Sequence, residues 1–258
     1  NTPLFLRECN LTSSNLEHGF KHVAIRMLKK TLHKCADRII SPANAIKNHL
    51  QINFGISPDK MITIYNPVQV EEIRSNLQPH HPGKNRSVYN IVAAGTLEYR
   101  KGFDLLIDVI SIIVEENHKV HLTLLGDGPE KENLRKQIHS LNLSYHVRLA
   151  GYQINPFTYF SKADLFVLSS RYEGLPNAML ESLACGTPVV AFNCPGGIDE
   201  IIVDELQGAL VPENDVHALS KAIEKQMRSH RHAKGSLLPD KFDAKAVVPA
   251  YEKLALSE

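Results

Sequence analysis

Two kinds of hydrophobic pattern alternate along most of the chain. Short, nearly continuous apolar runs predict buried strands, and longer segments with apolar residues three or four positions apart predict amphipathic helices. The strands are expected at 88–94, 121–125, 147–150, 164–168 and 188–192, and the helices at 103–114, 130–141, 176–184 and 216–228. Such alternation is typical of a parallel sheet covered by helices on both faces. We therefore predict an α/β fold with a Rossmann-like parallel sheet.

The first seventy residues follow a different pattern. A strand is already in progress at Pro3, a short strand is expected at 36–41, and a helix is expected at 42–50 with Pro42 in its first turn. The polar stretch 78–85 predicts a loop before the main α/β region. Because the chain begins without Met inside a strand, we expect that an earlier part of an N-terminal domain is missing.

One segment of this first part is amphipathic and basic. Phe20, Val23, Met27, Leu28 and Leu32 fall at helical spacing, and Lys and Arg residues occupy the opposite face. A helix of this kind over 20–34 could lie on an anionic membrane surface. The alternative, a solvated charged face, stays open.

Composition narrows the class of protein. The 258 residues are 43% hydrophobic and 22% charged, which excludes a disordered chain, a collagen and a coiled coil. A net charge of +1 and the lack of a basic stripe with interleaved aromatics give no signal for nucleic-acid binding. The four cysteines have no paired spacing, so we expect neither a disulfide framework nor a zinc site and predict a cytoplasmic protein.

The loops that follow the predicted strands carry the candidate chemistry, because ligands of parallel sheets bind at the carboxyl ends of the strands. The loop after the first of these strands runs from Gly95 and Thr96 to Arg100 and Lys101 at the start of a helix. Two cations beside a helix N-terminus predict an anion site. The next loop begins Gly126-Asp127-Gly128-Pro129, but Lys131 stands where the third glycine of a dinucleotide fingerprint belongs, so it predicts only a tight turn.

The loop after the fourth of these strands is the most specific feature. Glu173 precedes the predicted helix, Gly174, Leu175, Pro176 and Asn177 begin it, and Glu181 lies inside it. Free N–H groups near its start are expected to face a cleft. Since two carboxylates would repel phosphate, sugar or ribose hydroxyls are their expected partners.

No metal or other cofactor is expected. The chain contains no Asp-x-Asp motif of the kind that binds a metal-bound diphosphate, and its thirteen histidines show no metal-ligand spacing.

The run from Glu173 to Ala191 resembles the E-x7-E signature of the retaining GT-B glycosyltransferases of family 4, the glycosyl transferases group 1. Lys101-Gly102 is similar to the donor-phosphate lysine of that family, and Asp127-Gly128-Pro129 to its second-loop turn. Gly196-Gly197 before Glu200 also fits, and residues 242–254 resemble a C-terminal helix that crosses back. The resemblance covers nearly the whole chain and implies an N-terminally truncated member.

The resemblance implies three parts and an activity. Residues 1–70 would be the end of an acceptor-side domain, 71–235 the nucleotide-sugar-binding domain, and 236–258 a helix packing back toward the first. The implied reaction is metal-independent, retaining transfer of a hexose from a nucleotide-diphosphate sugar, UDP-linked in most members, to a glycan or lipid-linked acceptor. Such a transferase would act in cell-surface polysaccharide or glycoconjugate synthesis, peripherally at the cytoplasmic membrane, and this chain alone would be inactive.

The resemblance also assigns residues. Glu173, Lys101 and Arg100 would be catalytic and Glu181 would hold the ribose. The remaining donor contacts would be Gly95, Thr96, Asp127, Tyr152, Gln153, Gly174, Leu175, Pro176 and Asn177, with Tyr152 and Gln153 at the base. Two departures stand out: Thr96 where many members have arginine, and Glu8 with Cys9 where members often have histidine.

Two alternatives remain open. The chain could be a nucleotide-sugar-binding module without turnover, or the same fold could support a nucleotide-sugar epimerase or a phosphorylase. The E-x7-E loop disfavours the epimerase, and the lack of a pyridoxal-phosphate context disfavours the usual phosphorylase.

Overall fold

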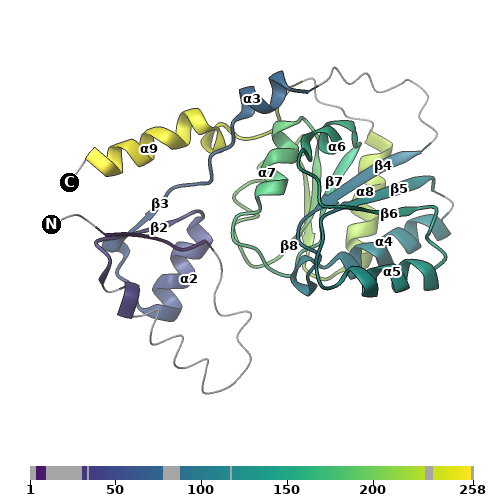
Figure 1. The fold of residues 1–258 in the computed structure, drawn as a ribbon, viewed down its shortest axis with the longest axis horizontal. Helices are drawn as coiled ribbons and strands as arrows, with labels where there is room; N and C mark the ends of the chain where they lie inside the picture. The colour runs from purple at the N-terminus through teal and green to yellow at the C-terminus, as the bar shows by residue number, and fades with distance from the viewer. Residues whose placement is uncertain are drawn as a thin grey trace.

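The computed structural model describes residues 4–9, 31–33, 35–77, 88–116, 118–229 and 235–256. Within these residues the chain forms two parallel sheets, a small one and a large one, that lie beside each other (Figure 1). Most of the expected basic helix at 20–34 and the expected loop at 78–85 lie outside the described residues.

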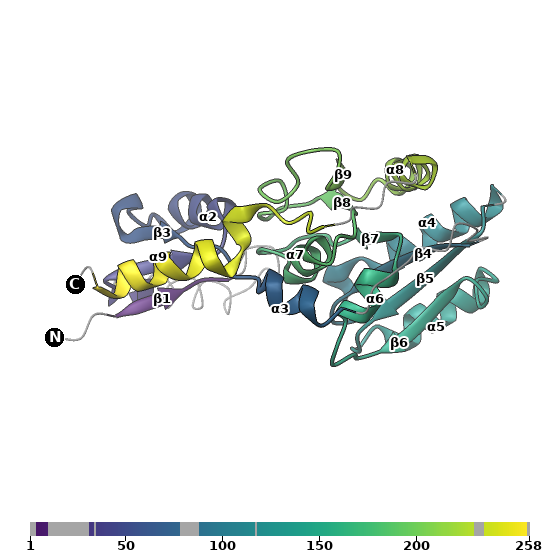
Figure 2. The same cartoon turned by 90° about the horizontal axis from the view of Figure 1, so that it is seen from above.

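The small sheet has the order β1-β2-β3, all parallel. Its elements are β1 (Phe5–Arg7), β2 (Arg38–Ser41), α2 (Asn44–Phe54), the short 3-10 helix η1 (Pro58–Lys60) and β3 (Met61–Thr63). The last helix of the chain, α9 (Ala244–Leu256), follows the 3-10 turn η3 (Asp240–Phe242) and lies along this sheet (Figure 2). Val247 and Leu254 of α9 are buried together with Ile40 and Ile64.

The large sheet has six parallel strands in the order β6-β5-β4-β7-β8-β9. The strands are β4 (Tyr89–Ala94), β5 (Val120–Leu125), β6 (Val147–Gly151), β7 (Leu165–Leu168), β8 (Val189–Asn193) and β9 (Gly208–Pro212). The helices are α3 (Val70–Ser75), α4 (Phe103–Glu115), α5 (Lys131–Ser140), α6 (Phe157–Lys162), α7 (Asn177–Ala184) and α8 (Val216–Ser229). Helix α4 packs against α5 and α8, whereas α7 packs against α6 and α3.

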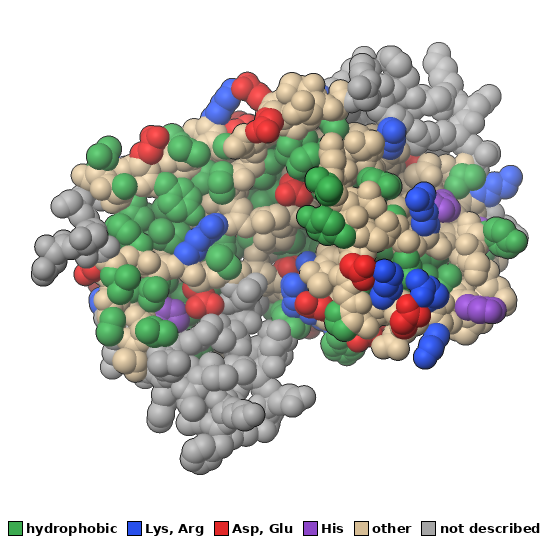
Figure 3. Space-filling model, in the orientation of Figure 1, with side chains coloured by type: hydrophobic (Ala, Val, Ile, Leu, Met, Phe, Trp, Pro, Cys, Tyr) green, Lys and Arg blue, Asp and Glu red, His purple; other side chains and the backbone are tan. Residues whose placement is uncertain are grey.

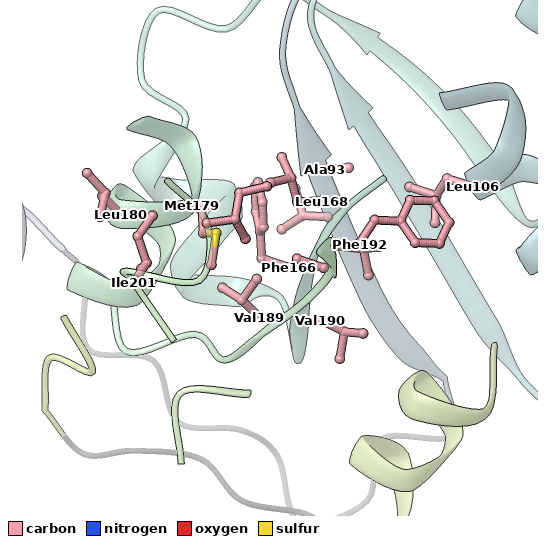
Figure 4. Packing of buried hydrophobic residues seen from close by; sticks show 14 of the residues in the cluster. Ala93, Leu106, Phe166, Leu168, Met179, Leu180, Val189, Val190, Phe192 and Ile201 are labelled. Carbon is pink, nitrogen blue, oxygen red and sulfur yellow. The ribbon is translucent and has the colours of Figure 1, made fainter. Parts of the chain in front are cut away.

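Continuous apolar strands are buried on both faces, which explains why they lack polar alternation. All four residues of β7 are buried, and Phe166 and Phe192 are fully inaccessible. Figure 4 shows Phe192 of β8 beside Leu106 of α4. It also shows Met179 and Leu180 of α7 near Ile201. The predicted α/β fold is therefore confirmed.

Within the described residues, the sequence pattern placed the predicted elements within a few residues of their observed bounds but missed four others. Strands β3 and β9 and helices α3 and α6 have only three to six residues, too few to show a period. Helix α7 begins at Asn177, not at Pro176, because Pro176 is an extended N-cap residue with ψ 101°. None of the helices in the described part of the chain is long and apolar enough to cross a bilayer.

Two chain segments connect the sheets and run side by side. The amide of Val68 donates to the carbonyl of Phe242 at 2.9 Å, and the amide of Ala244 donates to the carbonyl of Val68 at 2.9 Å. The ring of Tyr65 meets Phe242 edge to face, with centroids 4.7 Å apart. The outgoing and returning segments thus form one joint.

The assigned core of the large sheet can be tested by comparing a buried isoleucine with an exposed one. Ile110 of α4 is fully buried, whereas Ile154 is 92% exposed. We expect Ile110→Ala to lower the free energy of unfolding by about 2–5 kcal/mol, and Ile154→Ala to change it by less than about 0.5 kcal/mol, in urea denaturation. Equal effects of the two substitutions would contradict the assigned core.

Candidate functional site

Three loops meet at the carboxyl ends of β4, β7 and β8, which are neighbours in the large sheet. The β4 loop contains the 3-10 turn η2 (Tyr99–Lys101), the β7 loop contains Glu173, and the β8 loop contains Gly196 and Gly197. Side-by-side strands bring their loops together, so residues far apart in sequence can share one site.

The carboxylate of Glu173 is the centre of this meeting point. Its Oε1 accepts hydrogen bonds from Lys101 Nζ at 2.6 Å and from Ser170 Oγ at 2.7 Å, and its Oε2 accepts one from Arg100 at 3.0 Å. Glu173 is only 5% exposed. Because a buried carboxylate is costly without partners, the two cations belong to its environment and are not a solvated basic turn.

Glycines allow close approaches within the β4 loop and between the β4 and β7 loops. A Cβ on Gly95, at φ +156°, would lie 2.9 Å from the Lys101 side chain, and a Cβ on Gly102 would lie 2.0 Å from the carbonyl oxygen of Ser169. The hydroxyl of Ser169 donates to the carbonyl of Lys101 at 3.0 Å. The backbone of the cation-bearing turn is therefore fixed against the β7 loop.

Arg171 links the β7 loop to the β4 loop and to the start of α4. Its guanidinium donates to both carboxylate oxygens of Asp104, at 2.9 and 2.6 Å, and to the carbonyl of Tyr99 at 2.6 Å. It also lies 3.8 Å from the centroid of the Tyr99 ring. Hydrogen bonding to Asp104 raises the pKa of Arg171. These contacts of Arg171 were not predicted, since a single arginine in a loop has no distinguishing sequence pattern.

A cavity of about 460 Å³ opens at this point between the two sheets. The small-sheet part of the chain contributes Arg7, Cys9, Asn66 and Pro67 to its walls. Among the predicted residues, its lining includes Gly95, Arg100, Lys101, Glu173, Gly174, Leu175, Pro176 and Asn177. On the face drawn in Figure 3, basic and acidic side chains gather on the large-sheet part, whereas hydrophobic side chains gather over the small sheet.

A chain of hydrogen bonds crosses between the walls of this cavity. Arg7 donates to Oδ1 of Asn66 at 2.5 Å, and Nδ2 of Asn66 donates to Oδ1 of Asn177 at 2.5 Å. Neither Arg7 nor Asn66 was among the predicted site residues. Their separations from Asn177, 170 and 111 positions, leave no local signal in the sequence.

Glu181 lies apart from Glu173, in a neighbouring cavity of about 620 Å³. Pro67 lines both cavities, and the second is also lined by Gln69, Glu72, Ile73 and Asn76, at or next to α3, and by Ile154, Asn155 and Phe157. Burial raises the pKa of Glu181 to about 7. The two carboxylates of the signature therefore have different environments: one is held by cations, and one is desolvated.

The other predicted residues lie in nearby loops, outside the linings of these two cavities. Thr96 is exposed, and Tyr152 is 76% exposed. Gln153 donates to the carbonyl of Ala150 at 2.7 Å. Asp127 accepts hydrogen bonds from Lys131 Nζ and from the amide of Gly128, both at 2.8 Å, and these hold the pKa of its carboxyl below its usual value.

Potential metal ligands come together elsewhere in the described part of the chain. Ligand atoms of Glu116, His118 and Glu224 lie within 4.8 Å of one another. Glu116 follows the C-terminal end of α4, at the edge of the sheet opposite the cavity loops, and Arg228 contacts Glu224 at 3.4 Å. This group therefore contributes nothing to the candidate site.

The environment of Glu181 predicts a pH dependence of stability. The folded protein keeps the Glu181 proton up to a pKa of about 7, whereas the unfolded chain loses it near 4.5. The folded state therefore binds more protons between these values, and its stability falls as pH rises through them. We expect Glu181→Gln to be more stable than the wild type at about pH 8, by up to about 3 kcal/mol, and to lose this advantage near pH 4.5.

Urea denaturation at both pH values measures the difference. Glu132→Gln is the control, because the Glu132 side chain is 66% exposed. An advantage of Glu181→Gln that does not change with pH would contradict the assigned environment.

The chain is similar in sequence to bacterial glycosyltransferases. The chain is 27% identical over 257 residues to N-acetylgalactosamine-N,N'-diacetylbacillosaminyl-diphospho-undecaprenol 4-alpha-N-acetylgalactosaminyltransferase of Campylobacter jejuni, covering 99% of this chain and 68% of that protein. It is 34% identical over 174 residues to the lipopolysaccharide core biosynthesis glycosyltransferase LpsE of Rhizobium meliloti, covering 65% of this chain and 50% of LpsE. The chain thus spans about half to two thirds of the length of these relatives.

The fold has a counterpart among solved structures. The Anabaena protein HepE, crystallised in complex with UDP, superposes with a TM-score of 0.82 at 20% identity, over 99% of this chain and 72% of HepE.

Family models match both parts of the chain. Residues 8–72 match the model described as Glycosyltransferase Family 4, and residues 77–236 match the model described as Glycosyl transferases group 1. The expected family is therefore confirmed: the chain belongs to the group 1 glycosyl transferases, and its two parallel sheets have the GT-B fold.

Proposed function

We propose that the chain provides the donor site of a retaining glycosyltransferase that moves a sugar from a UDP-linked donor to a glycan or lipid-linked acceptor. The observation that carries this proposal is the Glu173 carboxylate held between Arg100 and Lys101 in the cavity between the two sheets. The UDP in the HepE structure and the diphospho-undecaprenol in the name of the Campylobacter relative support the donor and acceptor classes.

The leaving group of this reaction is a diphosphate, on which negative charge develops as the glycosidic bond breaks. Arg100 and Lys101 lie in the cavity wall beside Leu175, Pro176 and Asn177 at the start of α7. Cations and helix N–H groups fixed in advance can stabilise this charge without reorganising in the transition state. Thr96, in the same loop as the two cations, and Asp127, in the loop after β5, would contact other parts of the donor, since a carboxylate would repel the diphosphate.

Glu173 has two roles in this proposal. Its carboxylate holds the two cations in place, and it accepts hydrogen bonds from hydroxyls of the transferred sugar. Glu181 would bind the ribose hydroxyls from the second cavity, and Tyr152 and Gln153 would flank the base. Pro67 lines both cavities, and in this proposal one nucleotide sugar extends from one cavity into the other.

The proposed reaction uses no metal or other cofactor. The sequence contains no Asp-x-Asp motif, and the diphosphate would instead be neutralised by Arg100 and Lys101.

The acceptor class suggests where the protein would work. A lipid-linked or cell-surface glycan acceptor places the enzyme peripherally at the cytoplasmic face of a membrane. The basic segment 20–34 would bind anionic headgroups there. The proposed function involves no nucleic acid.

A specific observation favours the alternative of a nucleotide-sugar-binding module without turnover. Cys9 lines the cavity at the position where members of the family often have histidine. A thiol is a weaker hydrogen-bonding group than an imidazole. Transfer of radiolabelled sugar from the donor separates the two functions, because a module binds the donor and leaves it intact.

Lys101 provides the sharpest test of the proposed function. We expect Lys101→Ala to reduce the transfer rate by about 10²–10³-fold, because one fixed donor to the diphosphate is lost, and to leave the circular dichroism spectrum unchanged. The matched control is Lys136→Ala, since Lys136 is an exposed lysine of α5. Wild-type turnover in Lys101→Ala would contradict the assignment of the phosphate site.

A further inference from the structure

The carboxylate of Glu200 connects the two sheet units. Its Oε1 accepts a hydrogen bond from the backbone amide of Ala45 at 3.0 Å. Its Oε2 accepts one from Asn44 Nδ2 at 2.9 Å and one from the Tyr65 hydroxyl at 3.0 Å. Glu200 lies in the segment after β8, whereas these partners lie at the start of α2 and just after β3. All three hydrogen bonds therefore join residues at least 135 positions apart.

Helix α2 has no N-terminal cap of its own. Its N-cap residue, Ala43, has no side chain that can accept a hydrogen bond, and its first turn contains no acidic residue. The first amides of a helix need acceptors, and a negative charge there interacts favourably with the helix dipole. Glu200 supplies both the acceptor and the charge from the other unit of the protein.

The partners of Glu200 lead directly to the cavity. Burial and the hydrogen bond to Glu200 raise the pKa of Tyr65 to about 12, so its hydroxyl remains a donor. Tyr65 is followed by Asn66, which bonds Arg7 and Asn177 across the cavity. The position of Glu200 thus influences the small-sheet wall of the cavity.

The segment that carries Glu200 also contacts the large-sheet wall. The amide of Glu173 donates to the carbonyl of Pro195 at 2.9 Å, and the amide of Gly197 donates to the carbonyl of Gly174 at 2.8 Å. A Cβ on Gly197 would lie 2.5 Å from the Cβ of Ala43. This segment is therefore packed between Glu173 and the start of α2.

From this arrangement we propose that Glu200 is a positioning residue, which fixes α2 and the small-sheet wall of the cavity relative to Glu173. The catalytic consequence rests on the proposed function. Without the Glu200 carboxylate, α2 loses its cap and the two walls separate. Donor binding is retained, because Arg100, Lys101, Glu173 and Glu181 all belong to the large-sheet unit, but transfer is slowed because the acceptor-side wall is displaced.

The first test measures amide hydrogen exchange by mass spectrometry, without nucleotide, in the wild type, Glu200→Ala and Glu205→Ala. We expect faster exchange in Glu200→Ala in peptides from α2 and also in peptides containing Glu173 and Gly197. Glu205 is the matched control, because its side chain is 81% exposed, and its variant should exchange as the wild type does. Faster exchange confined to α2 would reduce Glu200 to a local helix cap and would overturn the proposal.

The second test separates binding from transfer. We expect Glu200→Ala to lower kcat by about ten- to a hundredfold, and to leave the KM for the donor and the Kd for UDP within about twofold of the wild type. Glu200→Gln keeps one oxygen acceptor for the Ala45 amide, so it should show a smaller loss, and it serves in place of Glu200→Ala if that variant does not fold. Unchanged kcat in both variants would contradict the proposal.

The two tests also distinguish this inference from the proposed function. If the wild type neither binds UDP nor transfers sugar, the proposed function fails, while the exchange experiment still decides whether Glu200 links α2 to Glu173.

Discussion

A carboxylate buried from water needs positive charge or hydrogen-bond donors around it, and the loops of the large sheet meet this requirement at Glu173. Lys101 and Arg100 reach it from the β4 loop, and Ser170 supplies a further donor. Once the two cations are placed, the rest of the site is constrained. The turn that carries them needs glycine at Gly95 and Gly102, and Arg171 holds the same turn against Asp104. Cations that are held in fixed positions are able to stabilise negative charge as it develops on a diphosphate.

The second constraint is the joint between the two units. The segment around Val68 and the segment around Phe242 are bonded to each other, and Glu200 adds a separate connection through the start of α2. The cavity lies between the walls that these connections hold, with Arg7 and Asn66 on one side and Glu173 on the other. In a GT-B fold the cleft between the two sheet units is therefore only as well defined as the contacts that fix their relative position.

The sequence was sufficient for those features that depend on neighbouring residues. The buried run of β7 has a clear apolar pattern, and the loop from Glu173 to Asn177 is contiguous, so its residues had to lie together. Contacts between distant segments were not accessible in this way. Arg7 and Asn66 line the cavity only because two units meet there, and no spacing in the sequence relates Glu200 to Ala45. The separation of Glu181 from Glu173 into neighbouring cavities likewise depends on where Pro67 and α3 lie.

The affinity of the cavity for a diphosphate can be measured by calorimetric titration with UDP and with uridine, both in the presence of EDTA. If Arg100, Lys101 and the start of α7 form a diphosphate site that needs no metal, UDP should bind at least about tenfold more tightly than uridine, a difference of about 1.4 kcal/mol or more. The tighter binding should also weaken as salt is added, since it depends on charge. Equal affinities for UDP and uridine would contradict a diphosphate site at Arg100 and Lys101, as would UDP binding that appears only when a divalent metal is added.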